Sequence, residues 1–470
     1  MKKFTRLLFV FIFITLCLAV FSSCGESKGL LYTDLYAEEG EEKNCYVDGI
    51  GECKDSKIII PEKNEQGITV TAVYMTMNSY IDCSHVTEMI LPETLKWFNY
   101  NYHAMIQEMP NLKFNEYENG KYLGTKDNPY FALIKSEDTY SERVNIHPDT
   151  KLIGRGAFSS KLKLETAILP EGIRYIGSGA FNGCKNLTSI YIPPSVIAMG
   201  EGPFWGCTSL ETFTVPGTLQ SVCSHMFVDC TALETVIIEE GIETIGHGAF
   251  SGCTALKDVI LPEGLKTVSM SAFDECSSLT EIAFKDGLET IGGNAFGRCS
   301  NLEKLSIPST VTYLGRSAFD DCDKLKYNTY ENALYLGNDE NPYVALIRPL
   351  STSVMRVTIP KTTTAIKDGA FMNCSNIKEI EIPEGVVHIG QDVFYKCTNL
   401  TTLTMPSTLK RIYYWAFKDC HSLLYVTYNG TIEQWQAMPK EDRHQGWAEG
   451  TTFKILRCAN GSINMTDQDR

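Results

Sequence analysis

Asp258 and Glu281 are the residues whose type and spacing come closest to a catalytic arrangement. They lie 23 residues apart, and Lys304 follows after the same interval. Residues at equivalent places in neighbouring strands lie roughly 5 Å apart, and retaining glycosidases hold two carboxylates at about that distance. The cation that comes next, and the absence of a pocket from an open sheet of repeats, favour a solvated charge ladder instead. We therefore predict no catalytic residue.

Metal, cofactor and nucleic-acid chemistry find no support in the sequence. The eight histidines show no metal-binding spacing such as His-Glu-x-x-His, and no Cys-x-x-Cys occurs. Residues 177–183 contain three glycines and superficially suggest a phosphate loop, but the pattern recurs once per repeat and indicates a turn. The net charge of −15 repels phosphate backbones. We predict no metal, no cofactor and no nucleic-acid partner.

Phenylalanines set the period of the chain. Each stands in a pattern Ile-Gly-x-x-Ala-Phe-x-x-Cys, preceded by an apolar segment such as residues 187–193. Two runs separated by one period plus 29 residues repeat every 23 residues: Phe158, Phe181, Phe204, Phe227, Phe250, Phe273, Phe296 and Phe319, then Phe371, Phe394 and Phe417. A fixed period of this length predicts stacked copies of one structural unit.

We interpret each repeat as one coil. Residues 187–192 alternate as a short strand, and Pro193, which has no N–H, ends it. The phenylalanine fills the interior, so that the stacked coils form an aromatic spine. Glycine usually stands four residues before the phenylalanine, but a positive φ cannot be obligatory there, because other repeats hold Cys223, Ser269, Lys367 and Tyr413.

Ten cysteines share one column of the repeat, three residues after the phenylalanine: Cys184, Cys207, Cys230, Cys253, Cys276, Cys299, Cys322, Cys374, Cys397 and Cys420. Parallel side chains on neighbouring coils have Cβ atoms roughly 4.8 Å apart, whereas a disulfide has them about 3.8 Å apart. One column also cannot surround a zinc ion. We expect these thiols to act as small buried hydrophobic groups. Whether Cys45 and Cys53, which flank a glycine-containing turn, form a pair stays open.

The repeated pattern Leu-x-x-Ile-x-Ile-Pro, Ile-Gly, Ala-Phe-x-x-Cys resembles the BspA-type leucine-rich repeats of bacterial surface proteins. The opening Tyr46-Val-Asp-Gly-Ile-Gly51 and the ending Tyr428-Asn-Gly-Thr431 resemble the first coils and the closing cap of that family. The resemblance implies a β-rich leucine-rich-repeat solenoid of 23-residue coils, here over residues 29–427, with a C-terminal cap at 428–470. It also implies surface exposure and a role in adhesion or recognition.

A second, longer duplication interrupts the repeats. Residues 114–134 align with residues 327–347 at a constant offset of 213, with 13 of 21 positions identical. Both copies contain Tyr-Glu-Asn, Tyr-Leu-Gly and Asn-Pro-Tyr, and apolar segments around a polar Asn-Pro turn predict a β-hairpin. We place two hairpin-bearing insertions near residues 114–145 and 327–358. They either extend the edge of the solenoid or contact a ligand through Tyr130 and Tyr343.

One outward column of the strands is the most informative about function. It holds Ile168, Tyr191, Thr214, Ile237 and Ile260 and becomes polar in later repeats. Apolar residues stacked in register form a patch, and such patches usually mark interaction sites. The alternative is that another layer of the same coil covers the column. We predict ligand binding through Ile168, Tyr191, Ile237 and Ile260, with Tyr130 and Tyr343 as the second candidate set.

Residues 1–23 form a predicted signal peptide. Three cations precede an uncharged apolar stretch over residues 7–21, which is short for a membrane span. Two serines then precede Cys24, as in a bacterial lipobox, although Phe21 stands where leucine is usual. We predict lipidation of Cys24, a short tether at 24–28 and a cell-surface lipoprotein, with plain secretion as the alternative. Without the three cations the net charge of −15 becomes −18.

Together these features predict a non-enzymatic cell-surface protein that recognises an extracellular protein or glycan through the solenoid surface and touches a membrane only through its lipid anchor. The alternative is an extracellular hydrolase of polysaccharide or peptide, which needs a cleft that the repeats do not supply. A pocket beside the C-terminal cap favours the hydrolase. An apolar or aromatic strand face favours the binding protein.

Overall fold

The computed structural model describes residues 30–35, 44–49, 53–74, 83–138, 140–439 and 446–465. The predicted signal peptide, Cys24 and the tether lie outside these residues. The chain divides into two compact units. Unit 1 comprises Met1–Thr139, Asn145–Phe158 and Pro170–Ala180, and unit 2 comprises Tyr140–Val144, Ser159–Leu169 and Phe181–Arg470. Within the described part of both units, no helix has the length and apolar character needed to cross a bilayer.

Unit 1 combines antiparallel and parallel pairs of short strands. Its elements are β1 (Leu31–Leu35), β2 (Asn44–Gly49), β3 (Lys57–Ile59), β4 (Thr69–Val73), β5 (Glu88–Ile90), β6 (Trp97–Phe98), α1 (Tyr102–Glu108), β7 (Asn115–Tyr117), β8 (Gly120–Leu123), β9 (Ala132–Ser136), β11 (Leu152–Ile153) and β13 (Tyr175–Ile176). β1 pairs antiparallel with β2, whereas β2, β4 and β6 run parallel. β9, β11 and β13 are also parallel, and each belongs to a successive coil.

Unit 2 is a β-solenoid built mainly from parallel strands. Its elements are β10 (Arg143–Val144), β12 (Thr166–Ile168), β14 (Ser189–Tyr191), β15 (Ala198–Met199), β16 (Thr212–Val215), η1 (Gly217–Leu219), β17 (Ser221–Val222), β18 (Thr235–Ile238), β19 (Thr244–Ile245), β20 (Asp258–Ile260), β21 (Thr267–Val268), β22 (Glu281–Ala283), β23 (Thr290–Ile291), β24 (Lys304–Ser306), β25 (Tyr313–Leu314), β26 (Asn328–Tyr330), β27 (Ala333–Leu336), β28 (Ala345–Pro349), β29 (Ala365–Ile366), β30 (Glu379–Glu381), β31 (His388–Ile389), β32 (Thr402–Met405), β33 (Arg411–Ile412), β34 (Tyr425–Tyr428), α2 (Ile432–Ala437), β35 (Ile455–Cys458) and β36 (Gly461–Asn464).

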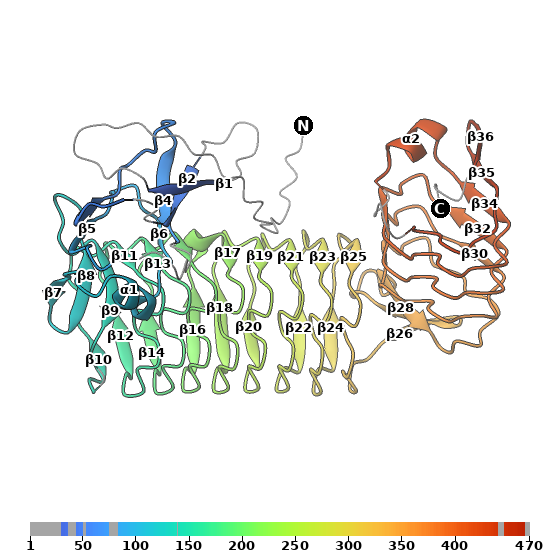
Figure 1. Ribbon diagram of the computed structural model, residues 1–470. Coiled ribbons are helices and arrows are strands. Elements are labelled where there is room, and N and C mark those ends of the chain that lie inside the picture. The colour runs from blue at the N-terminus through green and yellow to red at the C-terminus, as the bar shows by residue number, and fades with distance from the viewer. Residues whose placement is uncertain are drawn as a thin grey trace. The chain divides into compact units, whose positions relative to one another are not determined.

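Each regular coil contributes one strand to each of two rows. Figure 1 shows one row from β16 to β24 and the other from β17 to β25, in green to yellow. The register advances by one period per coil: Thr212 lies opposite Thr235, and Thr235 lies opposite Asp258. The predicted solenoid of 23-residue coils is therefore confirmed.

The phenylalanine spine is present as predicted. From Phe181 to Phe319, neighbouring rings have centroids 5.2–6.1 Å apart and interplanar angles of 8–17°. In the second run, Phe394 lies 5.0 Å from both Phe371 and Phe417. These rings are buried and offset-stacked, which is a favourable geometry for aromatic pairs. The insertion between the runs interrupts the spine between Phe319 and Phe371.

Two left-handed residues flank the phenylalanine in the tight turn of most coils. Around Phe227 they are His225 and Asp229, both with φ of 58°. The glycine four residues before the phenylalanine has another role, because its φ is not positive. A Cβ atom added to Gly246 would lie 2.6 Å from the carbonyl oxygen of Val222 in the preceding coil. Close stacking of backbones therefore favours glycine there, but glycine is not obligatory, because other coils hold Cys223, Ser269, Lys367 or Tyr413.

The repeat cysteines are buried, as predicted, and they also donate hydrogen bonds. The Sγ atom of Cys230 lies 3.1 Å from the carbonyl oxygen of Phe204, which also accepts the N–H of Cys207 at 3.1 Å. Burial raises the pKa of the Cys230 thiol well above its usual value, which keeps the donor protonated. The same bond, at 2.9–3.3 Å, is made by Cys207, Cys230, Cys253, Cys276, Cys299, Cys322, Cys397 and Cys420.

The two insertions have matching backbones. β7, β8 and β9 are antiparallel, as are β26, β27 and β28. In the first copy the Asn128 side chain accepts from Tyr130 N at 3.0 Å and donates to Asp149 O at 2.8 Å. Asn341 repeats this with Tyr343 N at 3.2 Å and Thr362 O at 2.9 Å. The duplicated Asn-Pro-Tyr sequence thus encodes a turn that is tied to the next coil.

The C-terminal end of unit 2 covers the last coil with aromatic side chains. Helix α2 begins with a capping box between Thr431 and Gln434. It places the buried Trp435 5.5 Å from Trp447, whose ring meets Phe417 edge-on at 5.8 Å. β34 then pairs parallel with β35, and β35 pairs antiparallel with β36. The last ring of the spine is therefore shielded from water.

Candidate ligand-binding surface

Four large apolar side chains project from strands of one row of unit 2, and we call Ile168, Tyr191, Ile237 and Ile260 the apolar stripe. Ile168 lies opposite Tyr191 across β12 and β14, and Ile237 lies opposite Ile260 across β18 and β20. Their exposed fractions are 74%, 53%, 39% and 55% in chain order. Among the residues that the structure describes, the four side chains are therefore exposed, and the column is not fully covered by another layer of the coil.

The alternation of the strands fixes the outward direction of the stripe. In β18, Val236 and Ile238 are buried on either side of Ile237, because successive side chains of a strand point to opposite faces. Thr214 lies in register with Ile237 but is polar, and it divides the stripe into two apolar pairs. Since the strands are held by the buried spine, the stripe is a preformed surface.

A row of mostly hydroxyl-bearing residues lies two positions earlier in each strand of this column and ends in an acid: Thr166, Ser189, Thr212, Thr235 and Asp258. Residues at positions i and i+2 of a strand share a face, so the apolar and hydroxyl rows run side by side. Nearby charges pair along the solenoid, as Lys257 and Glu234 do at 3.2 Å. This surface offers apolar contact and hydrogen bonds, but neither a nucleophile beside a base nor an enclosed site.

Of the two carboxylates with catalytic spacing, Asp258 lies in β20, two residues before Ile260 of the stripe, and Glu281 lies in β22 of the next coil. Glu281 of β22 lies directly opposite Lys304 of β24, and Asp258 lies opposite Thr235. All three charged side chains are exposed. Two exposed acids followed by a cation are the arrangement expected of a solvated charge ladder.

The second candidate set, Tyr130 and Tyr343, is partly buried in aromatic clusters. The Tyr130 ring stacks on His147 with centroids 3.9 Å apart and meets Tyr122 edge-on at 5.5 Å. The Tyr343 ring lies 5.3 Å from Tyr330 and 5.6 Å from Tyr335. Both tyrosines therefore pack within their hairpins, and they present less free surface than Tyr191.

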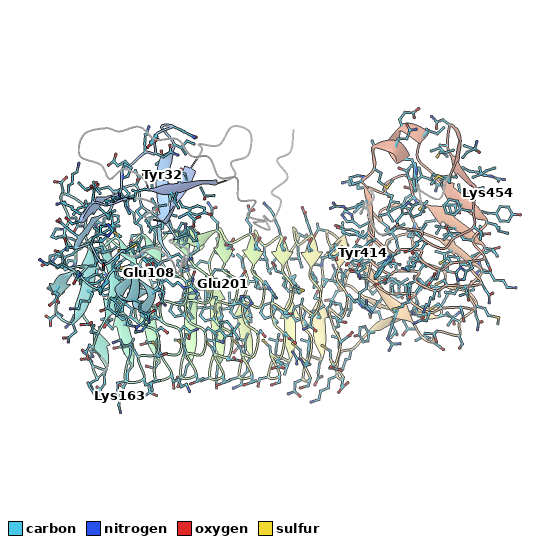
Figure 2. All side chains as sticks on the ribbon, viewed as in Figure 1. Tyr32, Glu108, Lys163, Glu201, Tyr414 and Lys454 are labelled. Carbon is cyan, nitrogen blue, oxygen red and sulfur yellow. The ribbon has the colours of Figure 1, made fainter. Side chains whose placement is uncertain are left out.

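A second exposed cluster lies on the turns of unit 2, and the sequence interpretation missed it. Trp205, with 43% of its surface exposed, stacks on His225 at 5.9 Å. His225 Nδ1 lies 2.7 Å from a carboxylate oxygen of Glu201, which is labelled in Figure 2. Burial and the neighbouring His225 lower the pKa of His247. The sequence did contain a signal for this cluster: Trp205 occupies a turn position of the repeat that holds mostly polar residues in the other coils.

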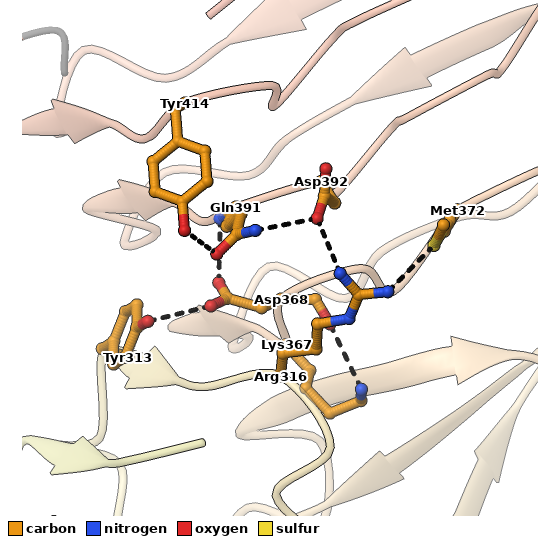
Figure 3. A network of polar contacts seen from close by, with 8 residues as sticks. All are labelled: Tyr313, Arg316, Lys367, Asp368, Met372, Gln391, Asp392 and Tyr414. Atoms are coloured by element: carbon orange, nitrogen blue, oxygen red, sulfur yellow. Dashed lines mark hydrogen bonds and ion pairs between the residues drawn. The ribbon is translucent and has the colours of Figure 1, made fainter. Parts of the chain in front are cut away.

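Buried charged residues gather where the second run of coils begins (Figure 3). Asp368 accepts from the Tyr313 hydroxyl at 2.8 Å and from Gln391 N at 3.0 Å. Asp392 pairs with Arg316 at 3.0 Å. Burial raises the pKa of Asp368 to about 6, and its carboxylate is almost fully enclosed. Each of these carboxylates is occupied by protein partners, so the network serves as a joint across the insertion.

Neither this joint nor the turn cluster forms a metal centre. Over the residues that the structure describes, no group of three or more histidine, cysteine, aspartate or glutamate side chains is placed to hold a metal ion.

The repeats match a known protein family. A family model described as a BspA type Leucine rich repeat region matches in six copies over residues 137–234, 221–339 and 350–438, which together make up more than half of the chain. The chain belongs to the BspA-type leucine-rich repeat family. The family resemblance of the sequence is thereby confirmed. β1 to β9 lie before the first matched residue of this BspA-type chain.

Two solved structures are similar to this chain. A leucine rich cell surface protein from Faecalibacterium prausnitzii is 24% identical, with a TM-score of 0.38, over 70% of this chain and 98% of that chain. A leucine-rich repeat protein from Bacteroides ovatus is 23% identical, with a TM-score of 0.36, over 90% of this BspA-type chain and 98% of its own. A search of curated proteins gives no significant match.

Proposed function

We propose that this BspA-type protein is a non-enzymatic recognition or adhesion protein of the cell surface, which binds an extracellular protein or glycan through the apolar stripe. The observation that carries the proposal is the exposure of Ile168, Tyr191, Ile237 and Ile260 in one row of strands of the solenoid. Exposed apolar patches of this kind are a common mark of interaction sites.

The energetics of apolar contact support this role. Full burial of one large apolar side chain contributes about 1.5–3 kcal/mol, while a micromolar complex needs about 8 kcal/mol. Four such side chains therefore supply a large share of the affinity, from which the cost of association is subtracted. Tyr191 is the strongest single anchor, since tyrosine combines an apolar ring with a hydrogen-bonding hydroxyl.

The binding test replaces Tyr191 and Ile237 with serine in the full chain and measures attachment of protein-coated beads to a panel of matrix proteins and glycans. We expect at least a ten-fold loss, because two anchors are removed. The matched control replaces Ile197 and Leu424, which are 48% and 53% exposed outside the stripe. Circular dichroism verifies folding. Attachment that survives the stripe variant but is lost with Tyr130→Ser and Tyr343→Ser would move the site to the hairpins.

The proposal includes export and lipid anchoring at Cys24. Expression in a bacterium with Cys24→Ser should release the protein from the membrane fraction and abolish incorporation of labelled fatty acid. Cys17→Ser, which alters a cysteine inside the apolar stretch, is the control and should stay membrane-bound. A wild-type protein that carries no lipid and begins at another residue would contradict anchoring and leave secretion.

A further inference from the structure

Unit 1 contains a pocket of about 290 Å³ that the repeat pattern did not reveal. Three cations surround it, Lys96, Lys151 and Arg174, together with three threonines, Thr69, Thr71 and Thr94. The side chains of Leu95, Phe131 and Tyr175, which are nearly buried, form its apolar lining. A volume at the lower end of the range for small-molecule sites, roughly 300–1,000 Å³, suits a ligand about the size of one sugar ring.

Backbone hydrogen bonds between coils hold the cations in place. Lys151 donates its N–H to Phe131 O at 2.9 Å, and Arg174 donates its N–H to Lys151 O at 2.8 Å. Lys151 and Arg174 therefore occupy successive rungs of one parallel sheet. Lys96 donates its N–H to Thr71 O at 2.8 Å, beside the sheet that contains β4 and β6. Lys96, Lys151 and Arg174 each directly precede a strand, namely β6, β11 and β13, and these backbone contacts favour a preformed site.

The charge of the pocket is opposite to that of the protein. Among the described residues, Glu93 is the one acidic residue that lines it, and its carboxylate accepts from the Thr125 hydroxyl at 3.4 Å. Within the described residues, none of the three cations forms an ion pair, whereas Lys57 and Glu88 of the same unit pair at 2.7 Å. Salt screens charges that lie more than about 8–10 Å from a ligand in the pocket. The three nearby cations therefore influence the ligand more strongly than the acidic surface of the rest of the protein does.

The threonines add hydrogen-bonding capacity beside the cations. The Thr94 hydroxyl donates to Val70 O at 2.7 Å, which leaves its oxygen as an acceptor for a ligand hydroxyl. The Thr69 and Thr71 side chains have no hydrogen-bonded protein partner in the described part of the chain. A ligand that pairs with the cations and also forms hydrogen bonds with the threonine hydroxyls carries an anionic group and several hydroxyls on a compact ring.

We propose that this pocket binds a carboxylated monosaccharide, either free or as the terminal residue of a glycan. Arginine and lysine hold the carboxylate by charge-assisted hydrogen bonds, and the threonine hydroxyls contact the sugar hydroxyls. The proposal does not depend on the apolar stripe, because the stripe belongs to unit 2 and uses apolar contact. If the experiment on one of the two sites fails, the other site can still be tested.

The experiment titrates the full chain with glucuronate, galacturonate and N-acetylneuraminate by calorimetry, and with glucose and galactose as neutral counterparts. We expect acidic sugars to bind at least ten-fold more tightly than neutral ones. Lys96→Gln with Arg174→Gln should reduce that binding at least ten-fold. Both side chains are exposed, so the fold is retained. The control changes Lys113 and Lys126, which are exposed cations of unit 1 outside the pocket.

The outcomes separate the possible sources of the anion. Tighter binding of a glycan with a terminal acidic sugar than of the free sugar assigns the site to glycans, and the reverse assigns it to free sugars. Equal binding of acidic and neutral sugars, or unchanged binding by the Lys96 and Arg174 variant, overturns the proposal. Inorganic phosphate that binds as tightly as the acidic sugars also overturns it, because the site would then select charge alone.

Discussion

The Sγ atom of Cys253 lies 3.1 Å from the carbonyl oxygen of Phe227, which belongs to the preceding coil. The same carbonyl accepts the N–H of Cys230 at 3.1 Å, so one oxygen receives a donor from its own turn and one from the next. Repetition of this pair along unit 2 links the cysteine column to the phenylalanine spine. A small apolar residue with a weak donor fits this position, which explains why cysteine recurs there.

We predict that the nine repeat cysteines from Cys207 to Cys420 are reduced thiols protected by folding. Burial raises the pKa of Cys253 and leaves little reactive thiolate. A thiol reagent should therefore modify them slowly in the folded protein, and at least nine should react after denaturation under nitrogen. Peptide mapping that finds several of them joined in disulfides would contradict the stacked column.

Phe250→Ala removes a central ring of the spine. Its neighbours Phe227 and Phe273 lie 5.4 and 5.2 Å away, so the substitution leaves a cavity that the coils cannot close. We expect a loss of about 3–5 kcal/mol in the free energy of unfolding. Because coils contact mainly their neighbours, hydrogen exchange should rise in the flanking coils. Tyr191→Ala, at an exposed ring, is the control and should change stability by about 0.5 kcal/mol or less. Uniform loosening of the chain would contradict a linear array.

Gly337→Ala tests the turn of the second insertion. A Cβ atom there would lie 2.0 Å from the carbonyl oxygen of Asn341, whereas one on Gly264 would meet nothing within 4 Å. We expect Gly337→Ala to destabilise the protein by about 1–3 kcal/mol through overpacking, and Gly264→Ala to change stability by about 0.5 kcal/mol or less. Denaturant unfolding measures the free energies, and hydrogen exchange locates the change in β27 and β28. Equal effects of the two alanines would rule out this account of the turn.

The joint in Figure 3 predicts a pH dependence of stability. Burial raises the pKa of Asp368 from 3.8 to about 6, so the folded state binds more protons than the unfolded state between these values. Stability from this group is therefore present below pH 3.8 and is lost as the pH rises through 6. The difference in free energy of unfolding between wild type and Asp368→Asn should shift by about 3 kcal/mol across this range, to the disadvantage of the wild type.

His388 acts in the opposite direction over the same range. Burial lowers its pKa from 6.5 to about 4, so its contribution is lost as the pH falls through 4. Each variant must therefore be compared with wild type separately. For His388→Gln, the difference in free energy of unfolding from wild type should change with pH in the opposite sense to that for Asp368→Asn. If the free energies of unfolding of wild type and Asp368→Asn changed with pH in parallel, burial would not raise the pKa of Asp368, and this prediction would be wrong.

The sequence by itself determined the coil and its outward faces. The period of 23 residues, the alternation around Tyr191 and the proline that ends the strand are local signals, and each coil repeats them in register. Since a one-residue slip would turn every strand side chain to the other face, the pattern predicted which residues project into solvent. The duplicated Asn-Pro-Tyr segments similarly predicted two related insertions, because equal local sequences favour equal turns.

Only the tertiary structure decided which side chains from different coils meet. Arg316 and Asp392 pair across 76 residues and an insertion whose path no periodicity specifies. The pocket brings Lys151 and Arg174, which are one period apart, together with Lys96, whose distance along the chain does not follow the repeat. The reason is physical: periodicity fixes where a side chain points within its own coil, whereas contact between unlike residues depends on how the interrupted coils pack.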